Sequence, residues 1–299
     1  MLPTAIDSLH LDTANVERPT GAPVLCLPGM FAGSWAFERL LPLIAARGYP
    51  AASVSYRGRP PGVAIRGVGS LSITDYGRDA SAAARTLDRP IAIGHSLGGL
   101  IALMLAGRNQ IRAAVLISSA PPRGISVFSW ALLARMTKYL PALLFNRPFI
   151  PSSRDFDAMV LNSVPAPQRA QLRARFTLDS GRAARQISLG VFKVPPRAMR
   201  VPLLVVSGDQ DRFVPLGVAR RIADKYDAPL HIAKGHGHFL FEEPGWETTA
   251  EVILDWIDAL PRVIRDPTAD IRLRPEPENS LPVTGIGTMS NHRHSPERK

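Results

Sequence analysis

The stretch 91–100 constrains the fold more than any other part of the chain. Its sequence, IAIGHSLGGL, is a short apolar run that breaks into glycine, serine and glycine and leads into a second apolar run, 100–106. This order predicts a buried strand, a sharp turn and a helix. Gly94 and Gly98 flank Ser96 in the pattern G-x-S-x-G, where a serine sits on a strained turn with its hydroxyl exposed and side chains at the glycines would clash with neighbouring backbone. The stretch therefore predicts a nucleophilic serine at the end of a strand.

Apolar runs alternate with helical patterns on both sides of this stretch. The predicted strands are 23–27, 51–56, 111–118, 201–207 and 230–233, and the predicted helices are about 36–47, 72–87, 216–226 and 246–260. Residues up to 22 are weakly patterned and fit a short hairpin at a sheet edge. The alternation predicts an α/β fold, with a mostly parallel central sheet covered by helices on both faces. In such sheets, ligands bind at the carboxyl ends of the strands.

About eighty residues separate two of these strands, and they predict an insertion. Residues 121–200 supply no predicted strand and much predicted helix, so we expect a helical cap at the carboxyl edge of the sheet. Residues 1–120 and 201–262 then form the core, which at this length can be one large domain. Residues 263–299 are rich in proline, arginine and glutamate without an apolar period, and we expect a disordered tail.

The net charge of +11 is concentrated in the expected cap. Residues 121–200 hold thirteen basic and three acidic side chains, which account for +10 of the total. Three interpretations stay open: a solvated surface, steering of an anionic group such as a carboxylate or the phosphates of a carrier-bound acyl chain, and weak contact with an anionic membrane surface. Nucleic-acid binding is disfavoured, because the aromatic residues do not interleave with the arginines as a stacking platform requires.

The sequence also predicts a compartment. It contains no run of 18 or more apolar residues, and residues 1–7 have neither a basic region nor an apolar stretch typical of a signal peptide. We therefore expect a cytoplasmic protein. Cys26, the one cysteine, lies in an apolar run, where a thiol usually acts as a small buried hydrophobe.

A serine hydroxyl needs an imidazole to take its proton and a carboxylate to orient that imidazole. Asp211 follows the strand 201–207 and His238 follows the strand 230–233, in the order serine, acid, histidine expected of this turn. Asp209 and His236 are the rivals. Asp209 fits better as the cap of its turn, and His238 is favoured because the apolar residues after it can wedge the loop against the core. His95 is expected to point away from the site.

These motifs resemble those of the α/β-hydrolase fold superfamily, in particular serine hydrolases of the esterase, lipase and thioesterase kind. The matching segments are 94–99 as the nucleophile turn, 208–215 as the acid loop and 237–244 as the histidine loop. The resemblance implies Ser96, Asp211 and His238 as catalytic residues, with the backbone N–H groups of Met30 and Leu97 as the oxyanion hole. The family's oxyanion loop usually reads His-Gly-x, whereas residues 28–30 read Pro-Gly-Met.

The resemblance further implies a serine hydrolase, carboxylesterase- or lipase-like, that cleaves an ester or thioester of a largely apolar acyl group without a metal or organic cofactor. Carbon–carbon bond hydrolysis, acyl transfer, elimination and a non-catalytic ligand receptor remain alternatives on the same fold. Apolar side chains of the expected cap mostly pack it onto the core, and some of them are candidates for an acyl pocket: Trp130, Leu132, Leu133, Met136, Tyr139, Leu140, Leu143, Leu144 and Phe145.

Overall fold

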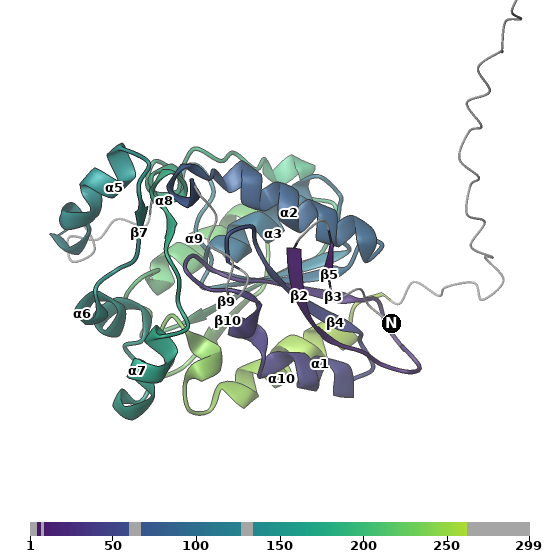
Figure 1. Ribbon diagram of the computed structural model, residues 1–299. Helices are drawn as coiled ribbons and strands as arrows, with labels where there is room; N and C mark the ends of the chain where they lie inside the picture. Colours follow the sequence, from purple (N-terminus) through teal and green to yellow (C-terminus); the bar gives the residue numbers. More distant parts are fainter. Residues whose placement is uncertain (1–4, 7–8, 60–66, 127–133, 262–299) are drawn as a thin grey trace, which may run out of the picture. The chain divides into compact units, whose positions relative to one another are not determined.

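A computed structural model describes residues 5–6, 9–59, 67–126 and 134–261, and within them a single large sheet organises the chain (Figure 1). Its strand order is β1-β2-β4-β3-β5-β6-β9-β10. The strands are β1 (Ala5–Ile6), β2 (Leu9–Ala14), β3 (Val24–Leu27), β4 (Ala51–Ser55), β5 (Ile91–His95), β6 (Ala113–Ile117), β9 (Leu203–Gly208) and β10 (Leu230–Ala233). β4, β3, β5, β6, β9 and β10 pair in parallel, while β1 and β2 form an antiparallel hairpin on the β4 edge. The predicted fold class is confirmed.

Helices cover both faces of this sheet, as Figure 1 shows. One face packs against α2 (Ile73–Thr86), α3 (Leu97–Gly107) and α9 (Leu216–Tyr226), and the other against α1 (Leu40–Ala46) and α10 (Trp246–Asp258). In β3, Leu25 and Leu27 enter the first core while Val24 and Cys26 enter the second. Successive strand side chains point to opposite faces, so a strand buried on both sides reads as a continuous apolar run. Burial also raises the pKa of the Cys26 thiol far above its usual value.

Local chemistry explains where α2 begins. Ser72 caps α2: its hydroxyl accepts the N–H of Asp75, and the Asp75 carboxylate accepts the N–H of Ser72. This reciprocal arrangement satisfies two otherwise free donors at the helix start. The helix predicted over 36–47 is instead split into a short 3-10 helix, Ser34–Phe37, and α1.

The residues 121–200, here called the inserted segment, contain short helices and two very short strands. The helices include α5 (Leu140–Leu144), α6 (Ser153–Asp155), α7 (Ala166–Arg173) and α8 (Gly181–Ser188), followed by η5 (Pro196–Ala198). β7 (Pro148–Phe149) and β8 (Asp179–Ser180) form an antiparallel pair, so the expectation of no strand here is wrong. Part of the predicted helical stretch, 127–133, and the predicted disordered tail lie outside the described residues. The α5, α6 and α7 helices gather to the left of the sheet in Figure 1.

No helix in the described part of the chain combines the length and the apolar character needed to cross a membrane.

Candidate active site

Ser96 occupies the sharp turn between β5 and α3. Its backbone angles are φ 53° and ψ −117°, a conformation that non-glycine residues rarely adopt. The turn is tight enough that a Cβ on Gly94 would lie 2.2 Å from the carbonyl oxygen of Gly98, and one on Gly98 would lie 1.9 Å from that of Leu27. The N–H of Ser96 donates to the Ile117 carbonyl at 2.9 Å, which ties the turn to β6. The sequence pattern thus produces the strained turn of a nucleophile elbow, and Ser96, itself 7% exposed, lines the cavity described below.

Asp211 and His238 meet beyond the ends of β9 and β10. The distance between Asp211 Oδ2 and His238 Nδ1 is 2.9 Å, and the two side chains are 0% and 3% exposed. Asp211 Oδ1 accepts the N–H groups of Phe213 at 2.9 Å and Val214 at 2.8 Å. Because an ionised carboxylate only accepts hydrogen bonds, Nδ1 of His238 carries the proton and its Nε2 is left to act as an acceptor. This is the tautomer that a general base for serine requires.

The two rival residues have other partners. Asp209 is exposed, and its Oδ1 accepts the N–H of Gly235 at 2.8 Å, which links the loop after β9 to the loop after β10. The Nδ1 of His236 lies 3.0 Å from the Lys234 carbonyl within its own loop. Asp211, rather than Asp209, is therefore the carboxylate against His238.

His95 lines the site, so the expectation that it points away is wrong. Its ring centroid is 4.8 Å from that of His238, and its Nε2 donates to the His238 carbonyl at 2.8 Å. Burial foremost, and then the nearby His238, lowers the pKa of His95 to about 3. A neutral His95 thus anchors the loop that carries His238. Strand alternation was the sequence signal for this position. His95 lies on the same side of β5 as Ile91 and Ile93, and these two residues belong to the core cluster that also contains Phe239.

Glu243 holds the same loop from a second side. Its buried carboxylate accepts the N–H of Gly237 at 2.6 Å through Oε2. Burial raises the pKa of Glu243, while the bond from Gly237 acts in the opposite direction. The sequence places Glu243 in the histidine loop but does not reveal this role, since the contact depends on how residues 237–243 turn back on themselves.

A largely apolar cavity opens over Ser96. The inserted segment contributes Pro151, Phe156, Val160 and Phe176 to its wall, and the remaining lining residues are Gly29, Met30, Phe31, Ala32, His95, Ser96, Phe213, His238 and Phe239. The expected acyl-pocket residues lie elsewhere where they are described: Leu140, Leu144 and Phe145 are exposed, Leu143 is buried, and Met136 and Tyr139 are half-buried without lining the cavity. Trp130, Leu132 and Leu133 lie outside the described residues.

Residues 28–32, here called the oxyanion loop, form the wall beside Ser96. No described residue accepts a hydrogen bond from the N–H of Met30 or from that of Leu97, the first residue of α3. The N–H of the next residue, Phe31, is taken by Asp179 Oδ2 at 2.6 Å. Leu97 lies at the helix N-terminus, where free N–H groups and the helix dipole favour negative charge. Both candidate donors are therefore available beside the serine.

Several charges of the inserted segment are paired. Arg173 contacts Asp157 at 2.5 Å, and Arg175 pairs with Glu38 while its guanidinium lies 4.4 Å from the ring centroid of Trp35. These two arginines are therefore engaged with carboxylates rather than free to attract an anionic substrate.

Comparisons with known proteins agree with this architecture. Residues 24–252 match the Alpha/beta hydrolase family. A monoacylglycerol lipase of Mycolicibacterium smegmatis is 31% identical over 180 residues, which cover 58% of this chain and 62% of that relative. Among solved structures, the monoacylglycerol lipase of Paleococcus ferrophilus (TM-score 0.63, 19% identity, 83% of this chain and 98% of that one) is similar. So is a putative non-heme bromoperoxidase, BpoC, of Mycobacterium tuberculosis (TM-score 0.65, 19% identity, 86% and 98%). At such identities the two structures show a shared fold alone.

Proposed function

This chain belongs to the alpha/beta hydrolase family, and we propose that it is a serine hydrolase that cleaves an ester of a largely apolar acyl group. The observation that carries the proposal is that two features line one apolar cavity: Ser96 on its strained turn, and His238 paired with the buried Asp211. A carboxylate, an imidazole and a serine so arranged are the parts that nucleophilic acyl transfer needs.

The proposed cycle uses these side chains in turn. His238 takes the hydroxyl proton through Nε2 as Ser96 attacks the carbonyl carbon, and the backbone N–H groups of Met30 and Leu97 hold the oxyanion that forms. His238 then gives its proton to the leaving alcohol or thiol. A water, deprotonated by the same imidazole, attacks the acyl-enzyme and frees the acid. Asp211 keeps Nδ1 protonated throughout and stabilises the imidazolium.

The cavity wall supports an apolar acyl group as substrate. Rings of Phe156, Phe176, Phe213 and Phe239 surround the site, and such a wall favours a hydrocarbon chain over a small polar group. Since the relative from M. smegmatis is named a monoacylglycerol lipase, we propose a monoacylglycerol-like ester as the first substrate to test. A thioester of the same acyl group is the second, because the same triad serves both.

The inserted segment is proposed to act as the cap of this cavity, since it supplies Pro151, Phe156, Val160 and Phe176.

The inserted segment is also proposed to touch anionic membrane surfaces. Among the described residues, every large hydrophobic side chain that is exposed lies in it: Leu140, Leu144, Phe145, Ile150, Leu178, Leu189 and Val191. Exposed apolar side chains next to an excess of arginine suit a lipid–water interface.

A fluorophosphonate probe tests the central proposal. We expect covalent labelling of the intact protein, loss of labelling in Ser96→Ala, and hydrolysis of nitrophenyl esters that rises with acyl chain length. A monoacylglycerol and an acyl thioester are then compared under the same conditions. Intact protein that neither takes the label nor hydrolyses any ester of the series would rule out the proposed function.

A further inference from the structure

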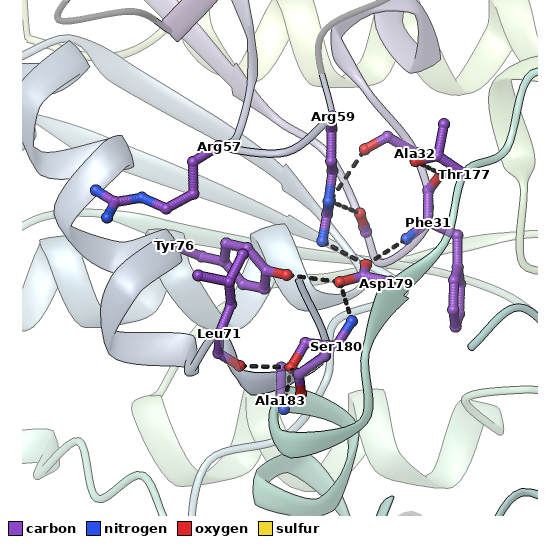
Figure 2. A network of polar contacts seen from close by, with 12 residues as sticks. Phe31, Ala32, Arg57, Arg59, Leu71, Tyr76, Thr177, Asp179, Ser180 and Ala183 are labelled. Atoms are coloured by element: carbon purple, nitrogen blue, oxygen red, sulfur yellow. Dashed lines mark hydrogen bonds and ion pairs between the residues drawn. The ribbon is translucent and has the colours of Figure 1, made fainter. Parts of the chain in front are cut away.

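A buried ion pair, Arg59 and Asp179, forms hydrogen bonds to the backbone of the oxyanion loop (Figure 2). Arg59 Nη1 donates to the carbonyl oxygens of Gly29 at 2.6 Å and Ala32 at 3.0 Å, and its Nη2 donates to Asp179 Oδ2 at 2.5 Å. The same carboxylate oxygen accepts the N–H of Phe31 at 2.6 Å. Met30, whose N–H is the proposed oxyanion donor, lies between Gly29 and Phe31, which these hydrogen bonds hold.

The surroundings make the pair rigid. Asp179 Oδ1 accepts the Tyr76 hydroxyl and the N–H of Ser180, both at 2.6 Å. The guanidinium of Arg59 lies 4.7 Å from the ring centroid of Tyr76 and 5.1 Å from that of Tyr56. The Arg59 and Asp179 side chains are 2% and 0% exposed. A carboxylate that accepts four hydrogen bonds from fixed donors has a single orientation, because its oxygens have no free alternative partner.

The backbone conformation of Phe31 shows how these hydrogen bonds affect the loop. Its φ of 67° lies in the left-handed region, which is uncommon for a bulky residue. Its N–H is held by Asp179 and its carbonyl accepts the N–H of Thr177 at 2.9 Å. Both contacts come from the inserted segment, so residues 177–179 keep the oxyanion loop in a conformation that the loop alone disfavours.

We propose that Arg59 and Asp179 are positioning residues that aim the N–H of Met30 at the oxyanion. This rests on the proposed function. It adds a second role for the inserted segment, which completes the oxyanion hole as well as covering the cavity. The oxyanion hole is then correctly formed only while residues 177–179 are docked on the loop. A misplacement of about 1 Å can cost about a hundredfold in rate, so the direction of a single N–H matters.

The test is the double variant Arg59→Met/Asp179→Leu, which removes both charges and leaves neither one buried alone. We expect kcat to fall roughly ten- to a hundredfold, with KM changed less than about twofold. The affinity for a trifluoromethyl ketone, which adds to the serine and forms an oxyanion, should fall by the same factor as kcat. A loss of folding alone would not produce that proportion.

The matched control is Arg57→Met/Asp79→Leu. Arg57 lies on the same connection after β4, and its Nε donates to the buried Asp79 at 2.8 Å, but within the described residues this pair makes no hydrogen bond to the oxyanion loop. We expect kcat and ketone affinity of this control to stay within about twofold of the unmodified protein.

A second test, amide hydrogen exchange, is made on the unmodified protein and requires no substitution. The Phe31 N–H should be protected, and the Met30 N–H should become protected only when the ketone binds. Should the double variant fail to fold, Arg59→Lys replaces it, because a single ammonium cannot reach the carboxylate and both carbonyls in one plane.

The inference is overturned if a folded variant keeps kcat, if kcat falls while ketone affinity does not, or if the Phe31 amide exchanges freely. Failure of the proposed function would look different, because the unmodified protein would then neither hydrolyse esters nor take the fluorophosphonate label at Ser96.

Discussion

Replacing Asp211 by Asn should abolish most of the catalysis and leave the fold intact. The amide oxygen of Asn can still accept the N–H groups of Phe213 and Val214, which hold Oδ1 at 2.9 and 2.8 Å. Its NH2 group then takes the place of Oδ2, which lies 2.9 Å from His238 Nδ1. Because two donors cannot face each other, Nδ1 must become the acceptor and the proton moves to Nε2. In that tautomer the imidazole cannot take the proton of Ser96.

The expected loss is about 10³- to 10⁴-fold in kcat, or roughly 4–5.5 kcal/mol of transition-state stabilisation. The assay is steady-state hydrolysis of a nitrophenyl ester together with the rate of fluorophosphonate labelling, and thermal unfolding checks the fold. Asp209→Asn is the control on the same loop, since its amide oxygen can keep the bond from Gly235, and it should stay within about twofold. A kcat of Asp211→Asn within tenfold of the unmodified protein would refute the assignment of the acid.

Three further variants test other parts of the structure. His95 has a pKa of about 3 in the folded chain against 6.5 normally, so the unfolded chain binds more protons between these values and stability falls as pH falls through this window. His95→Gln keeps a donor for the His238 carbonyl. Between pH 8 and pH 5, the free energy of unfolding of this variant should fall by about 2 kcal/mol less than that of the unmodified protein. Equal losses of both proteins in urea unfolding would contradict this. Leu144→Ser/Phe145→Ser should weaken binding to phosphatidylglycerol vesicles about tenfold or more, with kcat on a soluble ester unchanged, and unaltered sedimentation with vesicles would exclude these side chains from the interface. Val160→Phe should narrow the cavity and lower kcat/KM for long-chain nitrophenyl esters about tenfold relative to the acetate, whereas a parallel loss on both esters would show that Val160 does not face the acyl chain.

The sheet was predictable because its strands are buried on both faces. Such strands read as unbroken apolar runs, and 91–95 and 203–208 lie where those runs predict them, with ends shifted by one or two residues. The nucleophile turn was predictable for a different reason. A Cβ at Gly94 or Gly98 would overlap backbone, so the sequence must keep glycine there.

The walls of the cavity and the hold on its loops were not predictable in the same way. Phe156 and Phe176 reach the cavity through a π-helical turn and an irregular stretch, neither of which has a sequence period. Arg59 stands in a run of arginine, glycine and proline typical of a solvated loop, and Asp179 is 120 positions away. Local patterns report which face of an element is buried, but they carry no signal for a single polar contact across that distance.

The Arg59–Asp179 pair is hard to explain by stability alone. Removing two charges from water costs several kcal/mol for each ion, and apolar residues of similar volume in place of a buried pair are often neutral or stabilising. The Nε of Arg59 is buried and has no hydrogen-bond partner among the described residues, which costs about a further 1–3 kcal/mol. What the pair gives that an apolar contact cannot is direction: a planar guanidinium and a carboxylate fix the angles of every group they bind. Those groups belong to both chain neighbours of Met30. Such rigidity is useful here, because the proposed reaction depends on the direction of one N–H.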